Sequence, residues 1–107
     1  MIEDWERAVT RAALIHAEIV GYGASCDRSH LVRPDADGQA RAMRAALADG
    51  QLAPDDIDCV NAHGTATVEG DPVEVAALRH VFGARAARLP VSATKSMHGH
   101  LLGAAGA

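Results

Sequence analysis

Three short apolar segments, separated by stretches of helical character, constrain the fold of this chain most strongly. Residues 14–21, 57–62 and 89–94 are rich in Val, Ile, Leu and Ala, and each is predicted to form a strand. A stretch that is predicted to be helical lies between each segment and the next. Because parallel strands need a connection long enough to return along the sheet, the alternation predicts an α/β fold. The sheet is expected to be three-stranded and mainly parallel.

The first two predicted helices cover residues 3–13 and 38–48. The first has acidic residues in its opening turn, where they stabilise the helix dipole. Gly50 is predicted to end the second helix as a left-handed cap. Residues 22–37 between them mix Gly, Ser, Asp and Pro without either period, so a long loop is expected there.

A third helix has the clearest start signal in the chain. Asp71 is predicted to be its N-cap, with Pro72 at the first helical position and Glu74 completing a capping box. Gly83 is its predicted stop.

Composition excludes several classes of partner. The 107 residues suffice for one modest domain, and the formal charge of −4 comes without a Lys/Arg stripe, so no nucleic acid partner is expected. No apolar run approaches the roughly 20 residues that cross a bilayer, so no membrane association is expected. Cys26 and Cys59 are isolated and no secretory signal precedes them, which favours a reducing, cytoplasmic location without a disulfide.

Two histidine motifs follow the second and third predicted strands. They are N-A-H-G-T-A-T at residues 61–67, containing His63, and K-S-M-H-G-H at residues 95–100, containing His100. In open α/β sheets, ligands bind beyond the carboxyl ends of the strands. Both motifs are therefore predicted to contribute to one site. The second motif also contains Lys95, the only lysine of the chain.

Two ordinary explanations compete for these histidines. A histidine at a strand end is often structural, with its ring bonded to nearby backbone, and this is the default for His16 and His80. A metal site is a second possibility, because His98 and His100 form an H-x-H pair to which His63 could add a third nitrogen. No metal is expected, since the nearby acids are explained as turn and capping groups and a lysine would oppose a divalent cation.

Carbonyl chemistry is the third possibility. Two neutral imidazoles, His63 and His100, can donate Nε hydrogen bonds to one oxygen and stabilise the negative charge of a forming enolate. The ammonium of Lys95 disfavours imidazolium and so keeps the rings neutral. This combination suits decarboxylation of a thioester-bound malonyl group.

At these residues the chain resembles the β-ketoacyl-acyl carrier protein synthases, the condensing enzymes of fatty acid and polyketide synthesis. The matching segments are VNAHGTAT with the following GDPVE, and VSATKSMHGHLLGAAGA, while AEIVGYGASCD matches more loosely. The resemblance implies a partial thiolase-like fold. It also implies an acyl carrier protein as partner, a homodimeric or heterodimeric parent, and no cofactor beyond the phosphopantetheine that carries the substrates.

Carried over residue by residue, the resemblance makes His63 and His100 the imidazoles that act on the malonyl thioester. Lys95 becomes the lysine that tunes His100. Thr65 and Thr67 match threonines that line the path of the phosphopantetheine arm.

Three further residues have supporting or peripheral roles by the same resemblance. His30 lies in a loop that resembles the border of the acyl channel and is expected to contact substrate. Glu74 matches a family acid, although a capping role worth about 1 kcal/mol explains it equally well. Asp71 is expected to support the same turn as N-cap.

The resemblance also shows what the 107 residues do not contain. The nucleophilic cysteine of the family, in a sequence near Thr-Ala-Cys-Ser, does not occur, and neither Cys26 nor Cys59 is placed to replace it. Residues 1–107 are therefore interpreted as one partial domain, truncated at both ends, from the C-terminal half of an elongating ketosynthase. It would lack the last helix, two strands and a Gly-rich loop, and would be inactive alone.

The predicted activity of the intact protein is decarboxylative Claisen condensation of an acyl thioester with malonyl-acyl carrier protein. The alternative is a non-catalytic ketosynthase-like subunit, such as a chain-length factor, against which His63, Lys95 and His100 count. A thiolase is disfavoured because no second reactive cysteine is suitably placed.

Overall fold

The computed structural model describes residues 2–27 and 33–105. Its longer helices are α2 (Ala36–Asp49) and α3 (Gly70–Phe82), and the shorter ones are α1 (Trp5–Thr10) and α4 (Lys95–His98). The strands are β1 (Val60–Asn61) and β2 (Val91–Ser92). Three 3-10 turns complete the described elements: η1 (Pro54–Asp56), η2 (Gly83–Ala87) and η3 (Leu102–Ala104).

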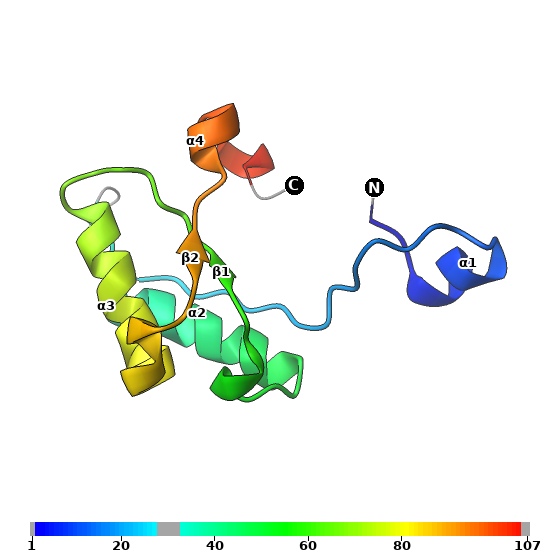
Figure 1. The fold of residues 1–107 in the computed structure, drawn as a ribbon, viewed down its shortest axis with the longest axis horizontal. Coiled ribbons are helices and arrows are strands. Elements are labelled where there is room, and N and C mark those ends of the chain that lie inside the picture. Colours follow the sequence, from blue (N-terminus) through cyan, green and yellow to red (C-terminus); the bar gives the residue numbers. More distant parts are fainter. Residues whose placement is uncertain (1, 28–32, 106–107) are drawn as a thin grey trace.

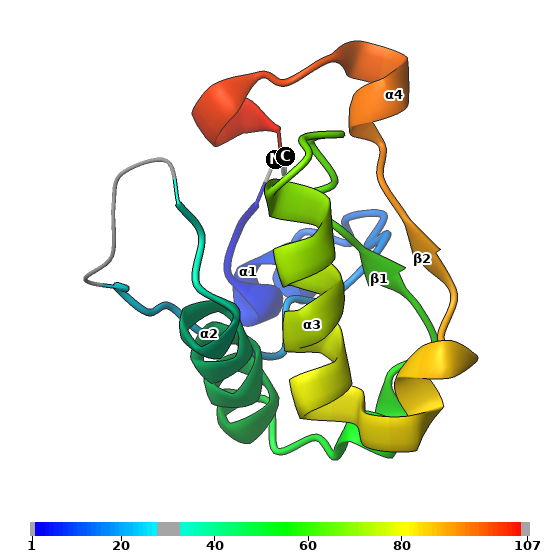
Figure 2. The same cartoon turned by 90° about the vertical axis from the view of Figure 1, so that its left-hand side faces the viewer.

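The described sheet consists of β1 and β2, which run parallel with Val60 opposite Val91 and Asn61 opposite Ser92. Helix α3 provides the crossover between them, and α2 packs along α3 (Figure 2). This arrangement confirms the α/β class. Both strands are only two residues long, and they lie within the predicted segments 57–62 and 89–94.

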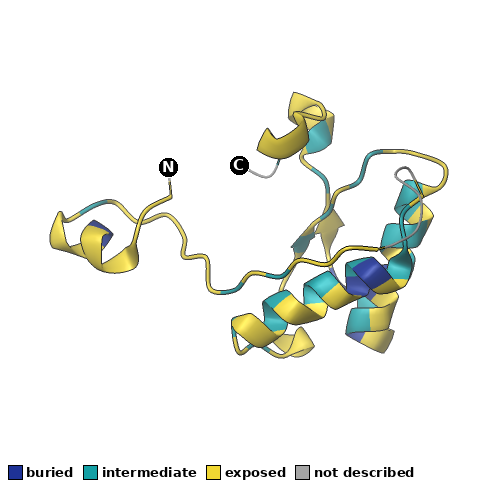
Figure 3. Cartoon of the chain, turned by 180° about the vertical axis from the view of Figure 1, so that it is seen from behind, coloured by how far each residue is buried: buried dark blue, intermediate teal, exposed yellow. Residues whose placement is uncertain are grey.

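The core lies between the helices and the sheet. Leu78 and Phe82 of α3 pack with Leu89, the residue that leads into β2. Met43 of α2 and Val60 of β1 complete the cluster from the two sides. Figure 3 shows buried stretches on α2 and α3, and a separate buried position on α1, where Ala8 is buried. The core therefore fixes the position of α3, and α3 in turn holds the loop that precedes it.

The predicted strand at residues 14–21 is wrong: in the described part of the chain the sheet has two strands, not three. Leu14 is 81% exposed and Ile19 is 70% exposed, so this apolar segment has no covering layer. A strand exists only when a neighbour accepts and donates its backbone hydrogen bonds. Figure 1 shows the segment running out from the core toward α1 without such a neighbour.

Only the end of this segment touches the body of the molecule. A Cβ at Gly23 would lie 2.1 Å from the Ala42 carbonyl oxygen, and one at Gly21 would lie 2.4 Å from that of Ala46. The Tyr22 amide donates a hydrogen bond to Asp49 Oδ2 at 2.9 Å. Glycine is required here because any side chain would collide with the backbone of α2.

Helix α2 begins two residues earlier and ends one residue later than the predicted 38–48. The Asp35 carboxylate accepts a hydrogen bond from the Gly38 amide at 2.9 Å and so caps its start. Gly50 has φ −76°, so its predicted left-handed conformation is wrong. Gln51 has φ 54° instead, because the longer helix moves the reversal one residue along the chain. Helix α1 is shorter than the predicted 3–13.

The start of α3 also differs from prediction. Its N-cap is Glu69, which makes no side-chain capping bond, and Asp71 lies inside the first turn. The capping box between Asp71 and Glu74 is therefore wrong, because both carboxylates bind the preceding loop instead. Gly83 ends the helix with φ 56°, which confirms the predicted stop. Among the described helices, none is both long and apolar enough to cross a bilayer.

Candidate active site

The two histidine motifs meet at one end of the sheet. Because β1 and β2 are parallel neighbours, the segments that follow them leave the sheet on the same side. The ring centroids of His63 and His100 lie 5.2 Å apart, with an interplanar angle of 87°. Both side chains are exposed, so a substrate could reach the two rings together.

Asn61, the last residue of β1, ties the two motifs to each other. Its Oδ1 accepts a hydrogen bond from the Thr94 amide at 3.3 Å, and its Nδ2 donates to Thr94 Oγ1 at 3.4 Å. Thr94 directly precedes α4, so the Asn61 side chain joins the first residue of one motif to the residue just before the other. Sequence reasoning missed this role, although a polar residue that ends an apolar strand is a signal for it.

Gly64 brings the two segments into direct contact. It has φ 47°, a conformation that favours glycine, and a Cβ there would lie 2.5 Å from the Cβ of Ala93. The glycine thus permits both the turn after His63 and the close approach of the segment after β2. No other residue would satisfy both requirements without a shift of the backbone.

Glu74 holds the His63 loop on α3. Its Oε1 accepts a hydrogen bond from the His63 amide at 2.7 Å, and its Oε2 accepts one from the Gly64 amide at 2.9 Å. Hydrogen bonds to an ionised carboxylate are among the stronger ones in proteins. Since Glu74 lies one turn before the buried Ala77 and Leu78, the core orients the carboxylate and the carboxylate orients the loop.

The two threonines lie side by side in the same loop. The hydroxyls of Thr65 and Thr67 are 3.2 Å apart, and Thr67 Oγ1 also accepts a hydrogen bond from the Gly70 amide at 3.0 Å. Ala66 between them has φ 59° and donates its amide hydrogen to Asp71 Oδ1 at 3.1 Å. Asp71 therefore supports the loop, but by a contact other than the one predicted.

One hydrogen bond sets the tautomer of His100. The Leu102 amide donates to His100 Nδ1 at 3.1 Å, so this nitrogen is an acceptor. A neutral His100 ring must then carry its proton on Nε2. Leu102 has φ 54°, the turn that aims its amide at the ring. In the neutral state, His100 thus presents an Nε2–H donor that this contact leaves free.

Among the described residues, the other polar side chains of the second motif make no hydrogen bond to either ring of the pair. The His98 ring contacts the Gly99 carbonyl oxygen at 2.8 Å and Thr94 Oγ1 at 3.1 Å, within its own turn. Lys95 begins α4, is half-buried, and makes no ion pair with another described residue. Nowhere in residues 2–27 and 33–105 do three His, Cys, Asp or Glu side chains gather closely enough to hold a metal ion.

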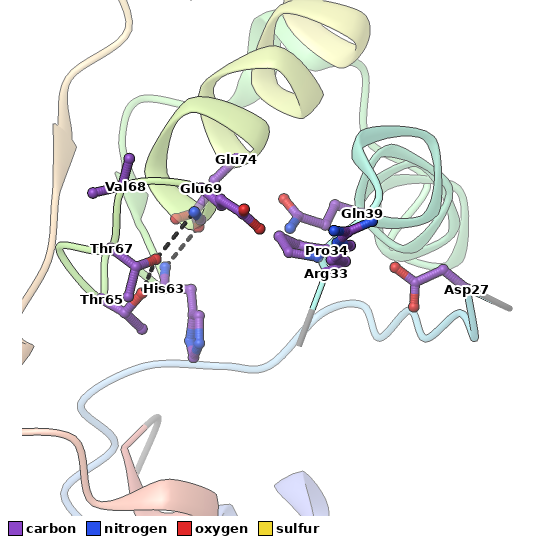
Figure 4. A pocket seen from close by; sticks show the side chains of 11 residues that line it. Asp27, Arg33, Pro34, Gln39, His63, Thr65, Thr67, Val68, Glu69 and Glu74 are labelled. Carbon is purple, nitrogen blue, oxygen red and sulfur yellow. Dashed lines mark hydrogen bonds between the residues drawn. The ribbon is translucent and has the colours of Figure 1, made fainter. Parts of the chain in front are cut away.

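A cleft of about 620 Å³ opens beside His63, between its loop and the start of α2. Figure 4 shows Thr65 and Thr67 on one side of this cleft and Gln39, Pro34 and Arg33 on the other. Its size is that of a site for a small organic ligand. The lining residues are Asp27, Arg33, Pro34, Gln39, His63, Thr65, Thr67, Val68, Glu69, Gly70 and Glu74.

Other candidates lie elsewhere. His30 is outside the described residues. Cys26 and Cys59 are exposed free thiols, and Cys59 precedes β1 rather than lying within it. His80 Nδ1 lies 3.1 Å from Asp37 Oδ1 and links α3 to α2 at the surface.

The chain is similar to known β-ketoacyl synthases. The family described as "Beta-ketoacyl synthase, C-terminal domain" matches residues 16–107. The 3-oxoacyl-[acyl-carrier-protein] synthase 2 of Coxiella burnetii is 49% identical over 109 residues, which cover 100% of this chain and 26% of that protein. The chain thus spans about a quarter of the length of the curated relatives that it matches.

Two solved structures share its fold. "The ishigamide ketosynthase/chain length factor" matches with a TM-score of 0.87 and 46% identity, over 94% of this chain and 25% of that one. A type II PKS acyl-carrier protein in complex with its ketosynthase bound to the hexaketide matches with a TM-score of 0.89 and 37% identity, over 96% of this chain and 26% of that one.

Proposed function

Since the chain belongs to the β-ketoacyl synthase family, matching its C-terminal domain and sharing its thiolase-like fold, we propose that it supplies the malonyl-activating part of a ketosynthase active site. The overall reaction is decarboxylative condensation of an acyl thioester with malonyl-acyl carrier protein. The chain would provide the groups that stabilise the enolate. The acyl-bearing thiol would come from outside these residues, because no Thr-Ala-Cys-Ser-like sequence occurs in them.

The convergence of His63 and His100 is the observation that carries this proposal. With ring centroids 5.2 Å apart, two Nε2–H groups can reach one carbonyl oxygen placed between them. The hydrogen bond from Leu102 to His100 Nδ1 supports this role, because it directs the His100 proton to Nε2. The thioester carbonyl of a malonyl group is the oxygen that such a pair would bind.

The proposed step moves one electron pair from a carbon–carbon bond to the thioester oxygen. The bond between the malonyl carboxylate and the methylene carbon breaks, and carbon dioxide leaves. The electron pair of that bond enters the enolate, whose negative charge develops on the thioester oxygen held by His63 and His100. The enolate carbon then attacks the carbonyl carbon of the acyl thioester, the carbon–sulfur bond breaks, and the thiolate that carried the acyl group leaves. Donors aimed at the developing charge lower the barrier because they are already oriented before the reaction.

Lys95 has a supporting role in this proposal. It begins α4, five positions before His100 in the chain, and is half-buried. We assign Lys95 the role of tuning His100, because it occupies the lysine position of the motif that resembles the family's.

The cleft beside His63 would receive the phosphopantetheine arm of an acyl carrier protein. Thr65 and Thr67 line it, and their hydroxyls can bond the amides of such an arm. The solved ketosynthase in complex with an acyl-carrier protein supports a carrier protein as the partner of this chain as well. Dimeric association with a second ketosynthase-type subunit is proposed on the same grounds.

A chimera tests the function. The chain would replace the matching quarter of the Coxiella burnetii relative, and carbon dioxide release from malonyl-acyl carrier protein would be measured. We expect His63→Ala and His100→Ala each to lower the rate about 100-fold or more, the loss typical of one removed oxyanion donor. His80→Gln, at the surface of α3, is the matched control. Undiminished decarboxylation in both alanine variants would contradict the proposal.

A chain-length-factor role is the second candidate, favoured by the similarity of the chain to the ishigamide ketosynthase/chain length factor structure. Such a subunit would shape an acyl tunnel without decarboxylating malonyl groups. A chimera that folds and dimerises yet releases no carbon dioxide, with His63 and His100 intact, would favour this role over the catalytic one.

A further inference from the structure

His98, the last residue of α4, makes a polar contact with each of its two ring nitrogens. Its Nδ1 lies 2.8 Å from the Gly99 carbonyl oxygen, and its Nε2 lies 3.1 Å from Thr94 Oγ1. The Gly99 carbonyl belongs to the peptide bond that joins Gly99 to His100. His98 therefore acts on His100 through the backbone.

The chemistry of these partners fixes which nitrogen of His98 carries hydrogen. A carbonyl oxygen can only accept a hydrogen bond, so Nδ1 must be the donor. In the neutral ring Nε2 is then unprotonated, and it accepts the hydroxyl hydrogen of Thr94. This tautomer is the opposite of that of His100, whose Nδ1 accepts from the Leu102 amide.

The Thr94 hydroxyl connects His98 to the end of β1. Its single hydrogen points at His98, while its oxygen accepts a hydrogen bond from Asn61 Nδ2 at 3.4 Å. Asn61 ends β1, two positions before His63. A series of hydrogen bonds that all run in one direction therefore leads from Asn61, through Thr94 and His98, to the carbonyl before His100.

Gly99 depends on partners outside itself to hold this geometry. It has φ 75° and ψ −179°, a region that glycine alone adopts readily, and glycine moves freely between its allowed conformations. Its amide donates to the Lys95 carbonyl oxygen at 2.8 Å, and its carbonyl accepts from His98. These two bonds fix the peptide planes on either side of Gly99, and so they set the point from which His100 projects.

We propose that His98 is a positioning residue, whose Nδ1–H holds the Gly99 carbonyl and thereby keeps the Nε2–H of His100 aimed at the oxygen that it shares with His63. This inference rests on the proposed function. His98 itself neither binds substrate nor transfers a proton. A donor that is poorly aimed stabilises the transition state less, while substrate binding is retained. Loss of His98 should therefore lower kcat and leave KM unchanged.

The two tautomers can be measured in the chain itself, without any activity. NMR spectra of the ring nitrogens, recorded at about pH 8 where ordinary imidazoles are neutral, distinguish the Nδ1–H form from the Nε2–H form. We expect the Nδ1–H form at His98 and the Nε2–H form at His100. An Nε2–H form at His98 would overturn the proposal, because the Gly99 carbonyl would then have no donor on that ring.

Two substitutions separate the two contacts of the ring. In His98→Asn the side-chain amide nitrogen takes the place of Nδ1 and can still donate to the Gly99 carbonyl. In His98→Gln the longer side chain places its amide near the position of Nε2 and leaves that carbonyl without its donor. The carbonyl carbon signal of Gly99 should therefore shift in His98→Gln and stay close to its native position in His98→Asn.

The rates are measured in the chimera with the Coxiella burnetii relative, as carbon dioxide release from malonyl-acyl carrier protein. We expect His98→Gln and His98→Ala to lower kcat about threefold to tenfold, the effect of one ordinary hydrogen bond, with KM unchanged. His98→Asn should retain most of the native kcat. Met97→Ala is the matched control, because Met97 is 86% exposed on the same helix, and it should keep the native kcat.

The other outcomes separate this inference from the proposed function. A native kcat in His98→Gln, or a kcat in His98→Asn as low as that in His98→Gln, would overturn the role of His98 and leave the proposed function standing. A raised KM with a native kcat would do the same, because His98 would then contribute to binding. A native chimera that releases no carbon dioxide would overturn both.

Discussion

Glu74 binds the loop of His63 with both of its carboxylate oxygens. One oxygen accepts a hydrogen bond from the His63 amide at 2.7 Å, and the other accepts one from the Gly64 amide at 2.9 Å. The acid lies on α3, whose next turn is buried in the core. The position of the imidazole is therefore coupled to the packing of the helix, and changes at Glu74 should alter both.

Glu74→Gln should destabilise the fold by about 1–3 kcal/mol, because a side-chain amide offers one oxygen where two amide donors require two. The –NH₂ group would also face a backbone N–H. Urea unfolding of the chain measures the loss, and faster hydrogen exchange of the His63 and Gly64 amides locates it. Glu69→Gln is the control, since Glu69 makes no side-chain capping bond. Equal stabilities of the two variants would contradict the prediction.

Gly64→Ala should cost about 2–4 kcal/mol through two separate effects. One is the left-handed φ of 47°, and the other is the contact of 2.5 Å with the Ala93 Cβ. Gly99→Ala has only a backbone effect, because nothing lies within 4 Å of a Cβ there; with φ 75° and ψ −179°, a region that glycine alone adopts readily, we expect a loss of about 1–3 kcal/mol. Adding Ala93→Gly should recover part of the stability of Gly64→Ala. A recovery of zero would mean that the contact with Ala93 carries no cost.

Asn61→Ala should lower the free energy of unfolding by about 1 kcal/mol, because the Thr94 amide loses its acceptor. Asn61→Asp keeps that acceptor and removes only the longer bond from Nδ2 to Thr94 Oγ1, so a smaller loss is expected. Thermal or urea unfolding of both variants is the measurement. Identical losses in the two variants would show that the hydrogen bond from the Thr94 amide to Asn61 Oδ1 does not contribute to stability.

The Glu3 carboxylate should titrate below its ordinary pKa of 4.5, because the Arg11 guanidinium donates hydrogen bonds to it. Because the pKa of Glu3 is lowered in the folded chain, the ion pair stabilises α1 fully when the pH is above the ordinary pKa of 4.5. This stabilisation is lost as the pH falls through the lowered pKa of the folded chain. An NMR titration of the side chain gives the pKa. Arg11→Gln should raise the pKa of Glu3, and Arg7→Gln should leave it unchanged. An unchanged titration in Arg11→Gln would refute the assignment.

Local patterns explain which parts of the fold are predictable. The stop at Gly83 follows from residues within a few positions of each other, and the structure reproduces it. The strand predicted at residues 14–21 has the right composition but no neighbour among the described residues. Composition favours a strand, but only pairing creates one.

The two acids near the start of α3 also show that a local pattern can fit more than one arrangement. The spacing of Asp71 and Glu74 is that of a capping box, yet the structure gives their oxygens to the amides of Ala66, His63 and Gly64. Both arrangements satisfy unpaired amide donors, and spacing alone does not distinguish them. The outcome depends on where the loop lies in space.

The α/β class, the two histidine motifs at the ends of neighbouring strands, and the family to which they belong can all be inferred from the residue pattern. The 5.2 Å approach of His63 to His100 and the two hydrogen bonds from Glu74 to the His63 loop are visible only in the folded chain. Periodicity and turn chemistry act between residues close in the chain, whereas strand pairing and the choice among competing hydrogen-bond acceptors depend on residues that meet only after the chain has folded.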